Sequence, residues 1–399
     1  MNVIVVGSGA GGGTVARELS RAGVNVTIID KGPLIKPKNA GECYESFTSG
    51  VEIMNTSCMG GTTMVTLGNA VRTCQHIFKK MGVDLEDEFK EVEMELNVNP
   101  LPDSHLGSGT RMIMDASASL GFNALKMPKF IDPSLCKPCG ECALGCKRDA
   151  KWTSMKYLQE AVASGAKVVD ETAITEIITE QGKVTGVKSK NREFKADMVV
   201  LSAGAISTPR LLSKTGIKAG DNLFVDTFVT VGGMFKGVKF NKEVLMYALI
   251  KQDDIILSPH YSEILVDKLK DKKARKKDIL GMMIKIKDDA SGKVTPDSVV
   301  KHSTARDVEL LSCGSAIAGS ILTEAGVDPR TLVSTPPRGA HPGGTAAMGK
   351  VVDTNLETDI PGLYVADASV FPEAPGAPPV LTIIALAKRL AKHIIHEYN

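Results

Sequence analysis

The first thirty residues of the chain place a glycine-rich turn between two apolar segments rich in β-branched residues. Val3–Val6 precedes the turn, whose sequence is GSGAGG at residues 7–12, and Val24–Asp30 lies farther on. Between them, Thr14–Ala22 has apolar residues at helical spacing. A strand, a helix and a second strand in this order predict a βαβ unit, and so an α/β fold with a parallel sheet.

The turn has the G-x-G-x-x-G pattern of a dinucleotide-binding site, between the strand and the helix that this pattern requires. We expect Gly7 to allow the tight turn, Gly9 to let the backbone approach a pyrophosphate, and Gly12 to allow close packing of the helix. The helix N-terminus adds unpaired N–H groups and a partial positive charge. Asp30, which closes the second strand, is positioned to accept a hydrogen bond from a ribose hydroxyl. The pattern does not by itself distinguish NAD from FAD.

The rest of the chain alternates between helix and strand patterns. We expect a helix near Ser154–Ala163 and then a meander of strands, over Ala173–Thr179 and Lys183–Lys188, that ends in a buried strand at Met198–Gly204. The second half is predicted to contain apolar strands such as VTVGGMF, a long helix around Asp307–Ala325, a buried strand at Leu363–Val365 and an amphipathic helix at Leu381–His396.

Three further segments carry motifs that belong with the opening turn. The first is GGTT at residues 60–63, followed by Arg72, and the second is LSAGAISTP at residues 201–209. The third lies near the C-terminus and contains HPGGT (341–345), GLYVADAS (362–369) and Pro379 before LTIIALA (381–387). In this order, the four segments resemble the signatures of the glucose–methanol–choline (GMC) family of FAD-dependent oxidoreductases.

The resemblance implies a cofactor, FAD, and a fold. The fold is α/β, with a FAD-binding Rossmann-like ββα domain and an inserted, mostly β, substrate domain. We expect the FAD domain to be discontinuous (1–100, 147–222 and 335–399), with a cysteine-bearing loop region at 101–146 and the substrate domain at 223–334. The residues expected to bind FAD are Gly7, Gly9, Gly12, Asp30, Gly60, Gly61, Thr62, Thr63, Ala173, Gly204, Asp367 and Pro379.

Asp367 and the last helix also have functions that general physics supports. Asp367 follows a buried strand at its carboxyl end, where ligands of open α/β sheets gather, so it can hold the ribityl or pyrophosphate part of the cofactor. A helix or turn cap is the alternative role for this carboxylate. The helix after Pro378-Pro379 can direct its positive N-terminal end at the flavin pyrimidine.

His341 is the only histidine embedded in glycine and small residues, in the segment GAHPGGTAAMG. By resemblance it is the family's catalytic histidine, which removes the hydroxyl proton of an alcohol as hydride leaves for flavin N5. The remaining histidines have no motif around them and are expected to be surface or packing residues: His76, His105, His260, His302, His393 and His396.

The chain departs from the family at two places. Thr215–Lys218 replaces the usual Ser-Gly-aliphatic-Gly ending of the second signature. Pro378 stands where the family usually has a histidine or asparagine that hydrogen-bonds the substrate oxygen. Proline has no side-chain donor or acceptor. Either another group supplies that bond, or the chemistry is not ordinary alcohol oxidation.

Four cysteines, Cys136, Cys139, Cys142 and Cys146, have the C-x2-C-x2-C-x3-C spacing of bacterial ferredoxins. This spacing favours a [4Fe-4S] cluster over zinc, whose sites usually use two separated pairs, and over reduced structural thiols. Lys147 stands where a proline often follows the run. If Cys146 cannot reach the cluster, another cysteine could supply the fourth thiolate: Cys43, Cys58, Cys74 or Cys313.

Charge and hydropathy restrict the partners and the compartment. Lys plus Arg minus Asp plus Glu is 48 − 46 = +2, so the composition gives no reason to expect nucleic acid. We expect no membrane span and no signal peptide, because the apolar runs are short and no basic segment precedes the first one. A cytoplasmic location follows. The basic run 268–277 is expected to be a solvated face, with a dock for an acidic carrier such as a ferredoxin as the alternative.

Taken together, these features predict an FAD-dependent dehydrogenase that oxidises a CH–OH group of a small-molecule substrate. Electrons would leave through the cysteine-bound iron–sulfur cluster to a ferredoxin-like acceptor. Two other functions remain open. One is an FAD-dependent enzyme that acts on a C–C or C=C bond, which Pro378 favours. The other is a flavin and iron–sulfur electron-transfer subunit, which a pocket beside the flavin and His341 would argue against.

Overall fold

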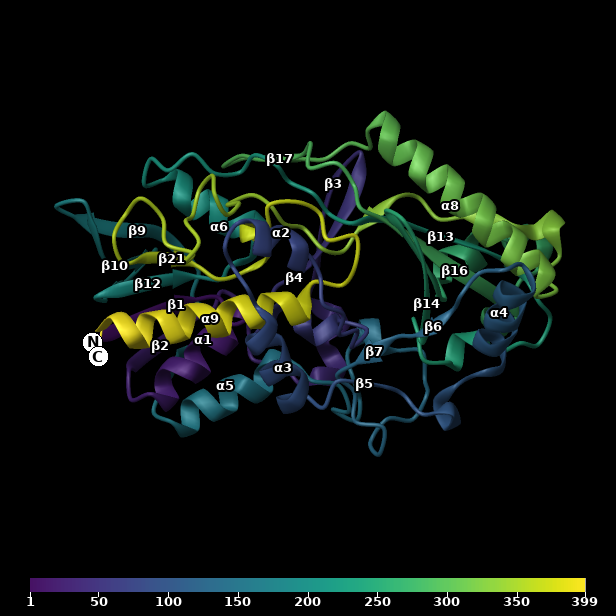
Figure 1. Cartoon of the computed structure of the whole chain (residues 1–399), viewed down its shortest axis with the longest axis horizontal. Helices are drawn as coiled ribbons and strands as arrows, with labels where there is room; N and C mark the ends of the chain where they lie inside the picture. Colours follow the sequence, from purple (N-terminus) through teal and green to yellow (C-terminus); the bar gives the residue numbers. More distant parts are fainter. Residues whose placement is uncertain (399) are drawn as a thin grey trace.

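The computed structural model describes residues 1–398 of the chain and has two parts, each built around its own sheet (Figure 1). The first part contains a parallel sheet and both chain ends, which lie side by side at one end of the molecule. The order of its strands is β21 (Leu363–Val365), β12 (Met198–Leu201), β1 (Asn2–Val6), β2 (Asn25–Ile29) and β8 (Lys167–Val169). All pairings in this sheet are parallel.

Helices cover one face of the parallel sheet, and a small antiparallel sheet covers the other (Figure 1). The helices are α1 (Ala10–Arg21), α5 (Ser154–Ala163) and α9 (Val380–Tyr398). The antiparallel sheet contains β9 (Ile174–Glu180), β10 (Lys183–Ser189) and β11 (Glu193–Lys195). This layering confirms the predicted ββα fold class.

A buried lysine joins the helices of the first layer. Lys388 of α9 is 1% exposed and donates hydrogen bonds to Glu91 and Glu95 of α3 (Glu86–Glu95) at 2.7 and 2.9 Å. It also reaches Glu18 of α1 at 3.2 Å. Because the ammonium is paired with several carboxylates, its burial between the helices is compensated.

The prediction that the meander ends in the strand at Met198–Gly204 was wrong. The third strand of the meander is β11, whereas β12 joins the parallel sheet between β1 and β21. All four residues of β12 are buried, as expected for a central strand of a sheet covered on both faces. The strand ends at Leu201, and helix α6 (Gly204–Ser213) begins three residues later.

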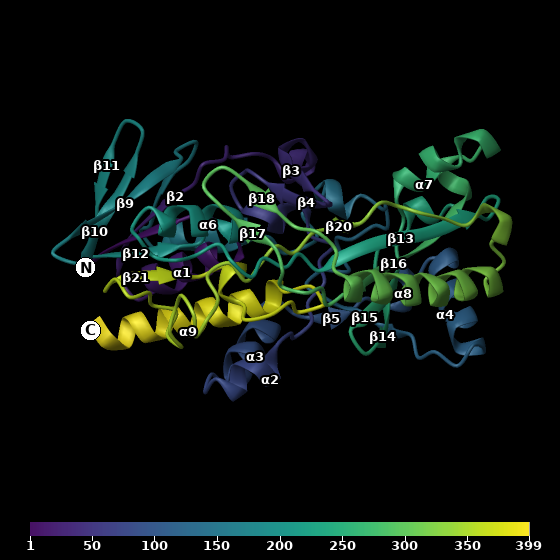
Figure 2. The same cartoon turned by 90° about the horizontal axis from the view of Figure 1, so that it is seen from above.

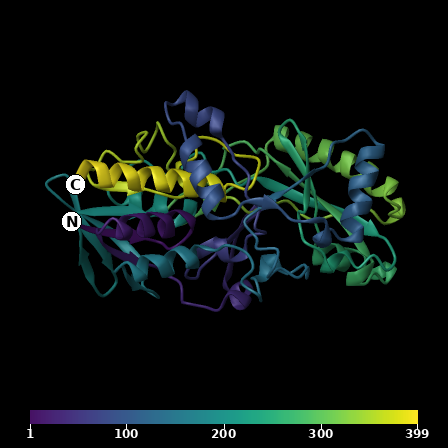
Figure 3. The same ribbon diagram turned by 60° about the horizontal axis from the view of Figure 1, so that its bottom comes forward.

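A larger, mostly antiparallel sheet forms the second part of the molecule (Figures 2 and 3). Its main path is β3 (Tyr44–Ser49), β4 (Val51–Thr56), β20 (Arg338–Gly339), β13 (Thr227–Met234), β16 (Ile279–Ile286), β15 (Ile255–Pro259), β14 (Ala248–Gln252) and β6 (Leu125–Lys126), and β19 (Val333–Ser334) pairs with β13. Helices α8 (Ala305–Glu324) and α4 (Ser108–Ser119) pack on it around an apolar core. This part therefore includes elements that precede residue 223, the expected start of the substrate domain. Strands β3, β4 and β6 belong to its sheet, and α4 packs on that sheet.

The remaining elements are short. They are α2 (Gln75–Lys80), α7 (Glu263–Lys268), the pair β5 (Asn99–Pro100) and β7 (Pro128–Lys129), and the pair β17 (Lys293–Val294) and β18 (Val299–Val300). Across residues 1–398, no helix has both the length and the apolar character that crossing a bilayer demands.

Candidate active site

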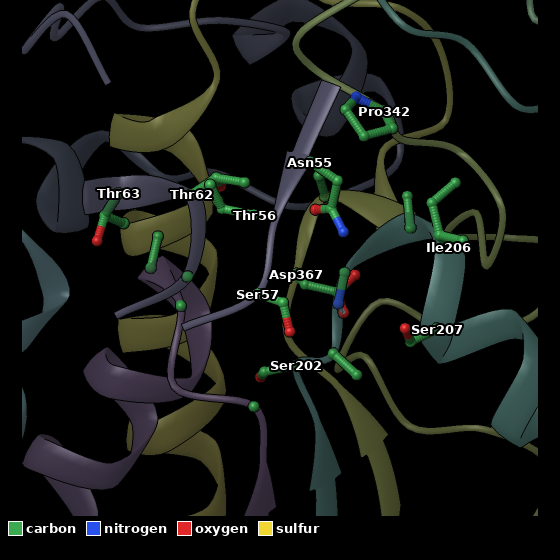
Figure 4. Close-up of a pocket in the computed structure, with 18 of the residues that line it drawn as sticks. Asn55, Thr56, Ser57, Thr62, Thr63, Ser202, Ile206, Ser207, Pro342 and Asp367 are labelled. Carbon is green, nitrogen blue, oxygen red and sulfur yellow. Dashed lines mark hydrogen bonds between the residues drawn. The ribbon is translucent and has the colours of Figure 1, made fainter. Parts of the chain in front are cut away.

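A continuous cavity of about 480 Å³ lies where the two parts of the molecule meet. Its wall includes the glycine turn and Asp30, and also His341 and Pro379. Figure 4 shows part of the wall between them, with Ser202 and Asp367 at the ends of neighbouring strands. The cavity therefore connects the predicted nucleotide end with the predicted catalytic histidine.

In the glycine turn at the start of α1, Gly12 is tightly packed against the backbone, whereas Gly9 faces open space. Gly7 has a φ of +98°, and a Cβ at Gly12 would lie 1.9 Å from the carbonyl oxygen of Gly7. The helix can approach the strand so closely only because Gly12 has no side chain. No atom lies within 4 Å of a Cβ placed at Gly9, which lines the cavity. This opening beside the helix N-terminus fits a pyrophosphate.

Asp30 links the turn to the second strand. Its carboxylate accepts hydrogen bonds from Ser8, through N at 2.8 Å and Oγ at 2.5 Å, and from the N–H of Gly32 at 2.8 Å. Asp30 lines the cavity, and an ionised carboxylate has about four acceptor positions, so one remains for a ribose hydroxyl.

Asp367 has the capping role that the sequence left open as its alternative. One oxygen accepts from Gly204 N at 2.9 Å and Thr208 Oγ1 at 2.6 Å, and the other accepts from Ser369 N at 2.8 Å. Burial raises the pKa of Asp367, and these hydrogen bonds oppose the rise. Asp367 also lines the cavity, so the same carboxylate holds the start of α6 at the cavity wall.

The second glycine box packs directly on the first. Gly61 has a φ of +54°, and its Cβ position lies 3.2 Å from Gly9 Cα. The N–H of Gly60 donates to Ser8 Oγ at 2.9 Å. All the residues predicted to bind FAD line the cavity except Gly12 and Gly60, which lie behind its wall: those lining it are Gly7, Gly9, Asp30, Gly61, Thr62, Thr63, Ala173, Gly204, Asp367 and Pro379.

Thr56 supplies an independent sign that the cavity accepts a polar ligand. Its Oγ1 is buried and has no hydrogen-bond partner in residues 1–398. Thr56 lines the cavity and is labelled in Figure 4. Because buried hydroxyls are normally hydrogen-bonded, this orphaned oxygen fits a bound group with polar atoms.

His341 lies at the far end of the cavity and is held by a carboxylate. Its Nδ1 lies 2.9 Å from Oδ2 of Asp226, which is fully buried, whereas the histidine side chain is 19% exposed. The other oxygen of Asp226 accepts from the N–H of Gly376 at 2.9 Å. With Nδ1–H donating to Asp226, Nε2 keeps its lone pair, as a general base requires. We call this pair the His341–Asp226 dyad.

The dyad is electrostatically coupled to Lys285, another buried group of the cavity wall. Lys285 Nζ lies 3.4 Å from His341 Nδ1. Burial lowers the pKa of His341 well below its ordinary value, and the charge of Lys285 acts in the same direction. Burial raises the pKa of Asp226 to about 7, against the opposing effect of Lys285. His341 is therefore neutral at neutral pH and free to accept a proton.

Three polar residues at this end were missed or misplaced by sequence reasoning. Asp226 and Lys285 belong to no motif, and His260 was expected to be a surface or packing residue. Instead, His260 lines the cavity, with Nδ1 3.1 Å from Thr230 Oγ1. Burial, mainly, lowers the pKa of His260 to about 3, so this imidazole is neutral. The one available signal was the lone lysine in the apolar strand ILGMMIKI.

The N-terminus of α9 also borders the cavity. Pro378, Pro379, Val380 and Ile383 contribute to its wall. The N-terminal end of the helix therefore borders the same cavity as His341, and its orientation toward a flavin stays a prediction. Pro378 offers no polar side-chain group there.

The four predicted metal ligands lie on one loop, residues 132–150, which we call the cysteine loop. All four are free thiols, and Cys136 feels the charges of Cys139, Cys142 and Cys146. However, no three His, Cys, Asp or Glu side chains in residues 1–398 are arranged to hold one metal ion. The structure therefore shows no metal site in the cysteine loop.

Two buried lysines flank the cysteine loop, and Lys151 anchors it beside the cavity. Lys151 Nζ donates to the carbonyl oxygens of Met64, Thr66 and Cys142 at 2.6 to 2.9 Å. Lys129 Nζ donates to the carbonyl oxygens of Leu67 and Leu245 and to Asn69 Oδ1. Neither ammonium forms a salt bridge with a carboxylate in the described part of the chain. Thr66, Leu67, Asn69 and Ala143 also line the cavity, so the loop borders it.

Comparison with known proteins gives consistent matches. Family models described as GMC oxidoreductase match residues 2–233 and 288–387. An uncharacterized protein of Methanocaldococcus jannaschii is 39% identical over 98% of this chain and 99% of its own length. An uncharacterized GMC-type oxidoreductase of Mycobacterium tuberculosis is 26% identical, over 99% of this chain and 76% of the relative.

Two better-characterized proteins are more distant. A long-chain-alcohol oxidase of Arabidopsis thaliana is 21% identical, over 98% of this chain and 67% of the oxidase. The crystal structure of pyridoxine 4-oxidase from Mesorbium loti superposes with a TM-score of 0.75 at 15% identity and covers all of both chains. This likeness supports the fold.

Proposed function

Because this chain belongs to the GMC oxidoreductase family and is an FAD-dependent oxidoreductase acting on CH–OH donors, we propose that it oxidises an alcohol with His341 as the proton acceptor. One observation carries this proposal. His341, which Asp226 holds at 2.9 Å, lines the same cavity as the glycine turn. The carboxylate of Asp226 fixes the ring so that Nε2 is the nitrogen left to take a proton.

The residues of the cavity fit FAD. Gly9 leaves an open cradle at the N-terminus of α1, Asp30 has an acceptor position for a ribose hydroxyl, and Thr56 has an unpaired buried hydroxyl. We propose that these residues, with the second glycine box and the wall around Asp367, hold the cofactor. When bound, the flavin supplies the two-electron acceptor for hydride from the substrate carbon.

The chain's own residues then have separate tasks. His341 accepts the hydroxyl proton at Nε2, and Asp226 holds the imidazole in the tautomer that makes this transfer feasible. Asp226 is fully buried, so water has no access to the carboxylate that holds the imidazole. A neutral, oriented imidazole is a suitable base for this step.

The substrate is proposed to be an alcohol with an apolar body. The cavity wall near the dyad is largely apolar and includes Met54, Leu67, Phe228, Met246 and Met283. Relatives named as a long-chain-alcohol oxidase and pyridoxine 4-oxidase are consistent with an alcohol bearing an aliphatic or aromatic group.

We also propose, as a finer point, that the cysteine loop receives a [4Fe-4S] cluster and passes electrons to a ferredoxin-like acceptor, which makes the protein a dehydrogenase. The structure shows no such group, so no step of the reaction above depends on it. Its support is the ligand spacing together with Lys129 and Lys151, two buried cations whose cost an anionic cluster would offset. The eight free thiols agree with a cytoplasmic location.

Of the alternatives, the electron-transfer subunit is disfavoured by the cavity that His341 lines. An enzyme acting on a C=C bond would not need the His341–Asp226 dyad as a base for a hydroxyl proton. Cleavage of a C–C bond beside a hydroxyl would need such a base, but it would leave the flavin oxidised. The deciding experiment is anaerobic mixing of the purified holoprotein with a panel of primary alcohols, including 1-octanol and benzyl alcohol, while the flavin absorbance is followed. Bleaching of the flavin by at least one alcohol is expected. No reduction by any of them would contradict the proposal.

A further inference from the structure

Lys285 lies on β16, a central strand of the second sheet whose eight residues are all buried. Such a strand normally carries apolar residues only, and burying an ammonium is costly unless it is compensated. Yet Lys285 lines the cavity together with His341 and Phe228. Its position raises the question of what the charge does there.

The hydrogen-bonding capacity of Lys285 is not used up by the protein. In residues 1–398, Nζ lies 3.3 Å from the carbonyl oxygen of Asp226 and 3.4 Å from His341 Nδ1, and both contacts are long. The second partner is already engaged, because His341 Nδ1 lies 2.9 Å from the Asp226 carboxylate. An ammonium has three donors, so at least one is available to the cavity.

Nearby charges do not neutralise Lys285 by direct pairing either. No carboxylate of the described chain lies within salt-bridge distance of its Nζ. Burial lowers the pKa of Lys285, and the nearby carboxylates of Asp226 and Asp288 oppose this effect. Asp288 is itself paired with Lys301 at 2.8 Å. The face of Phe228 lies 5.1 Å from Nζ, which is a weak contact. Lys285 Nζ therefore lies beside the dyad with at least one N–H donor that no protein group accepts in the described part of the chain.

We propose that Lys285 is a second catalytic residue, whose Nζ donates a hydrogen bond to the substrate oxygen that His341 deprotonates. This inference rests on the proposed alcohol oxidation. It supplies the group that Pro378 does not offer, from the opposite part of the molecule.

The O–H bond of the alcohol breaks and its proton goes to His341 Nε2. The C–H bond breaks and its electron pair leaves as hydride for the flavin, while a C=O bond forms. Lys285 keeps its proton throughout and stabilises the negative charge that develops on oxygen. In a buried site such a donor is far more effective than in water.

His260 is the other polar side chain of this wall that could contact the oxygen. Its imidazole is neutral and its Nδ1 already contacts Thr230 Oγ1. It can donate one neutral hydrogen bond, but it brings no charge to an oxyanion. The structure therefore favours Lys285.

The first test compares Lys285→Met with Lys251→Met in the holoprotein. Methionine keeps the length and volume of the lysine stem but removes the donor, and Lys251 is an exposed lysine of β14 in the same sheet. With the alcohol that reduces the wild-type flavin fastest, Lys285→Met should slow reduction by about 10²–10³, as expected for loss of one oxyanion donor. Lys251→Met should be within about twofold. Unchanged reduction in Lys285→Met would overturn the proposal.

A second variant separates catalysis from folding. Lys285→Ala leaves a space that ethylammonium chloride can fill. Added ethylammonium should restore flavin reduction at least tenfold, and the restoration should decline as pH rises above the pKa of the amine, because the protonated form is the donor. Restoration by the neutral amine alone would make Lys285 a base, and no restoration would show that its role is structural. Either result rejects the proposal.

A binding measurement distinguishes this proposal from the proposed function. If no alcohol reduces the wild-type flavin, the alcohol oxidation itself has failed. Lys285 is then tested with benzoate, an oxyanion with an apolar body, by titrating the flavin absorbance of the wild type and Lys285→Met. Binding that weakens at least tenfold in the variant supports an oxygen-binding role for Lys285. Equal affinity, or no binding to the wild type, contradicts it.

Discussion

The dyad and the cysteine loop both concentrate reactive side chains beside the same cavity, but they are built in opposite ways. Asp226, Lys285 and His341 are far apart in the sequence and come together from different segments within 2.9 to 3.4 Å. The four cysteines lie within eleven residues, at 136–146, yet no three of them are arranged to hold a metal ion. Asp226, Lys285 and His341 share no sequence motif, yet they lie close together. The four cysteines have the clearest motif of the chain, yet they do not form a metal site.

The difference shows what each kind of pattern specifies. A run of cysteines at fixed spacing predicts ligands for a group that must be present to draw the thiolates together. The dyad needs no such group, because the strands and loops that carry it are fixed by the cores of the two sheets. The structure therefore shows the contact between His341 and Asp226 without any bound group. The cysteine loop can be tested only with its proposed cluster bound.

The most severe test of the dyad is His341→Asn. Asparagine can still hydrogen-bond Asp226 but cannot accept a proton near neutrality, so alcohol-driven flavin reduction should fall by about 10²–10⁴. Stopped-flow absorbance under anaerobic conditions measures this rate. FAD content and melting temperature should stay close to wild type. A variant that loses its flavin and unfolds would instead make His341 a structural residue.

Asp226→Asn should have the next largest effect, because it disturbs the orientation of His341 while leaving the imidazole in place. We expect flavin reduction to slow by about 10–100-fold, as for partners that orient a functional histidine. Since the pKa of Asp226 is raised to about 7, its carboxylate gains charge as pH rises through that value. Wild-type reduction should therefore increase with pH around neutrality. The asparagine variant should lose this dependence, and a variant that retains it would assign the titration to another group.

The cofactor end of the cavity has its own matched pair, Gly9→Ala and Gly12→Ala. A Cβ at Gly9 points into open space, so the protein should fold normally but bind FAD about tenfold more weakly, at a cost of about 1.4 kcal/mol. A Cβ at Gly12 would collide with the carbonyl oxygen of Gly7, so this variant should fold poorly. Thermal unfolding with and without added FAD measures both. If Gly9→Ala and the wild type bind FAD with equal affinity, the pyrophosphate does not bind beside Gly9.

Sequence reasoning succeeded where the signal is local. The turn at residues 7–12, its flanking strands and the closing helix depend on neighbouring residues, and the structure contains them. The meander was extended one strand too far, because buried strands of different sheets look alike in sequence. Asp226, Lys285 and His260 were not found, since their proximity is created by strand pairing across the second sheet. The only local sequence signal was Lys285, a lysine in the otherwise apolar strand ILGMMIKI.

The smallest expected effect on alcohol oxidation comes from the cysteine loop, and it tests whether the two regions are independent. Single substitutions Cys136→Ser, Cys139→Ser and Cys142→Ser remove one thiolate each. Because these thiols are not part of the dyad, alcohol-driven flavin reduction should stay within about twofold of wild type. Iron and acid-labile sulfide in the anaerobically purified protein should fall, together with electron transfer to a ferredoxin. Wild-type protein with no iron would reject the cluster and leave Lys151 as an anchor of the loop. Slow flavin reduction in the serine variants would instead show that the loop also shapes the cavity, through the contacts of Lys151 with Thr66 and Cys142.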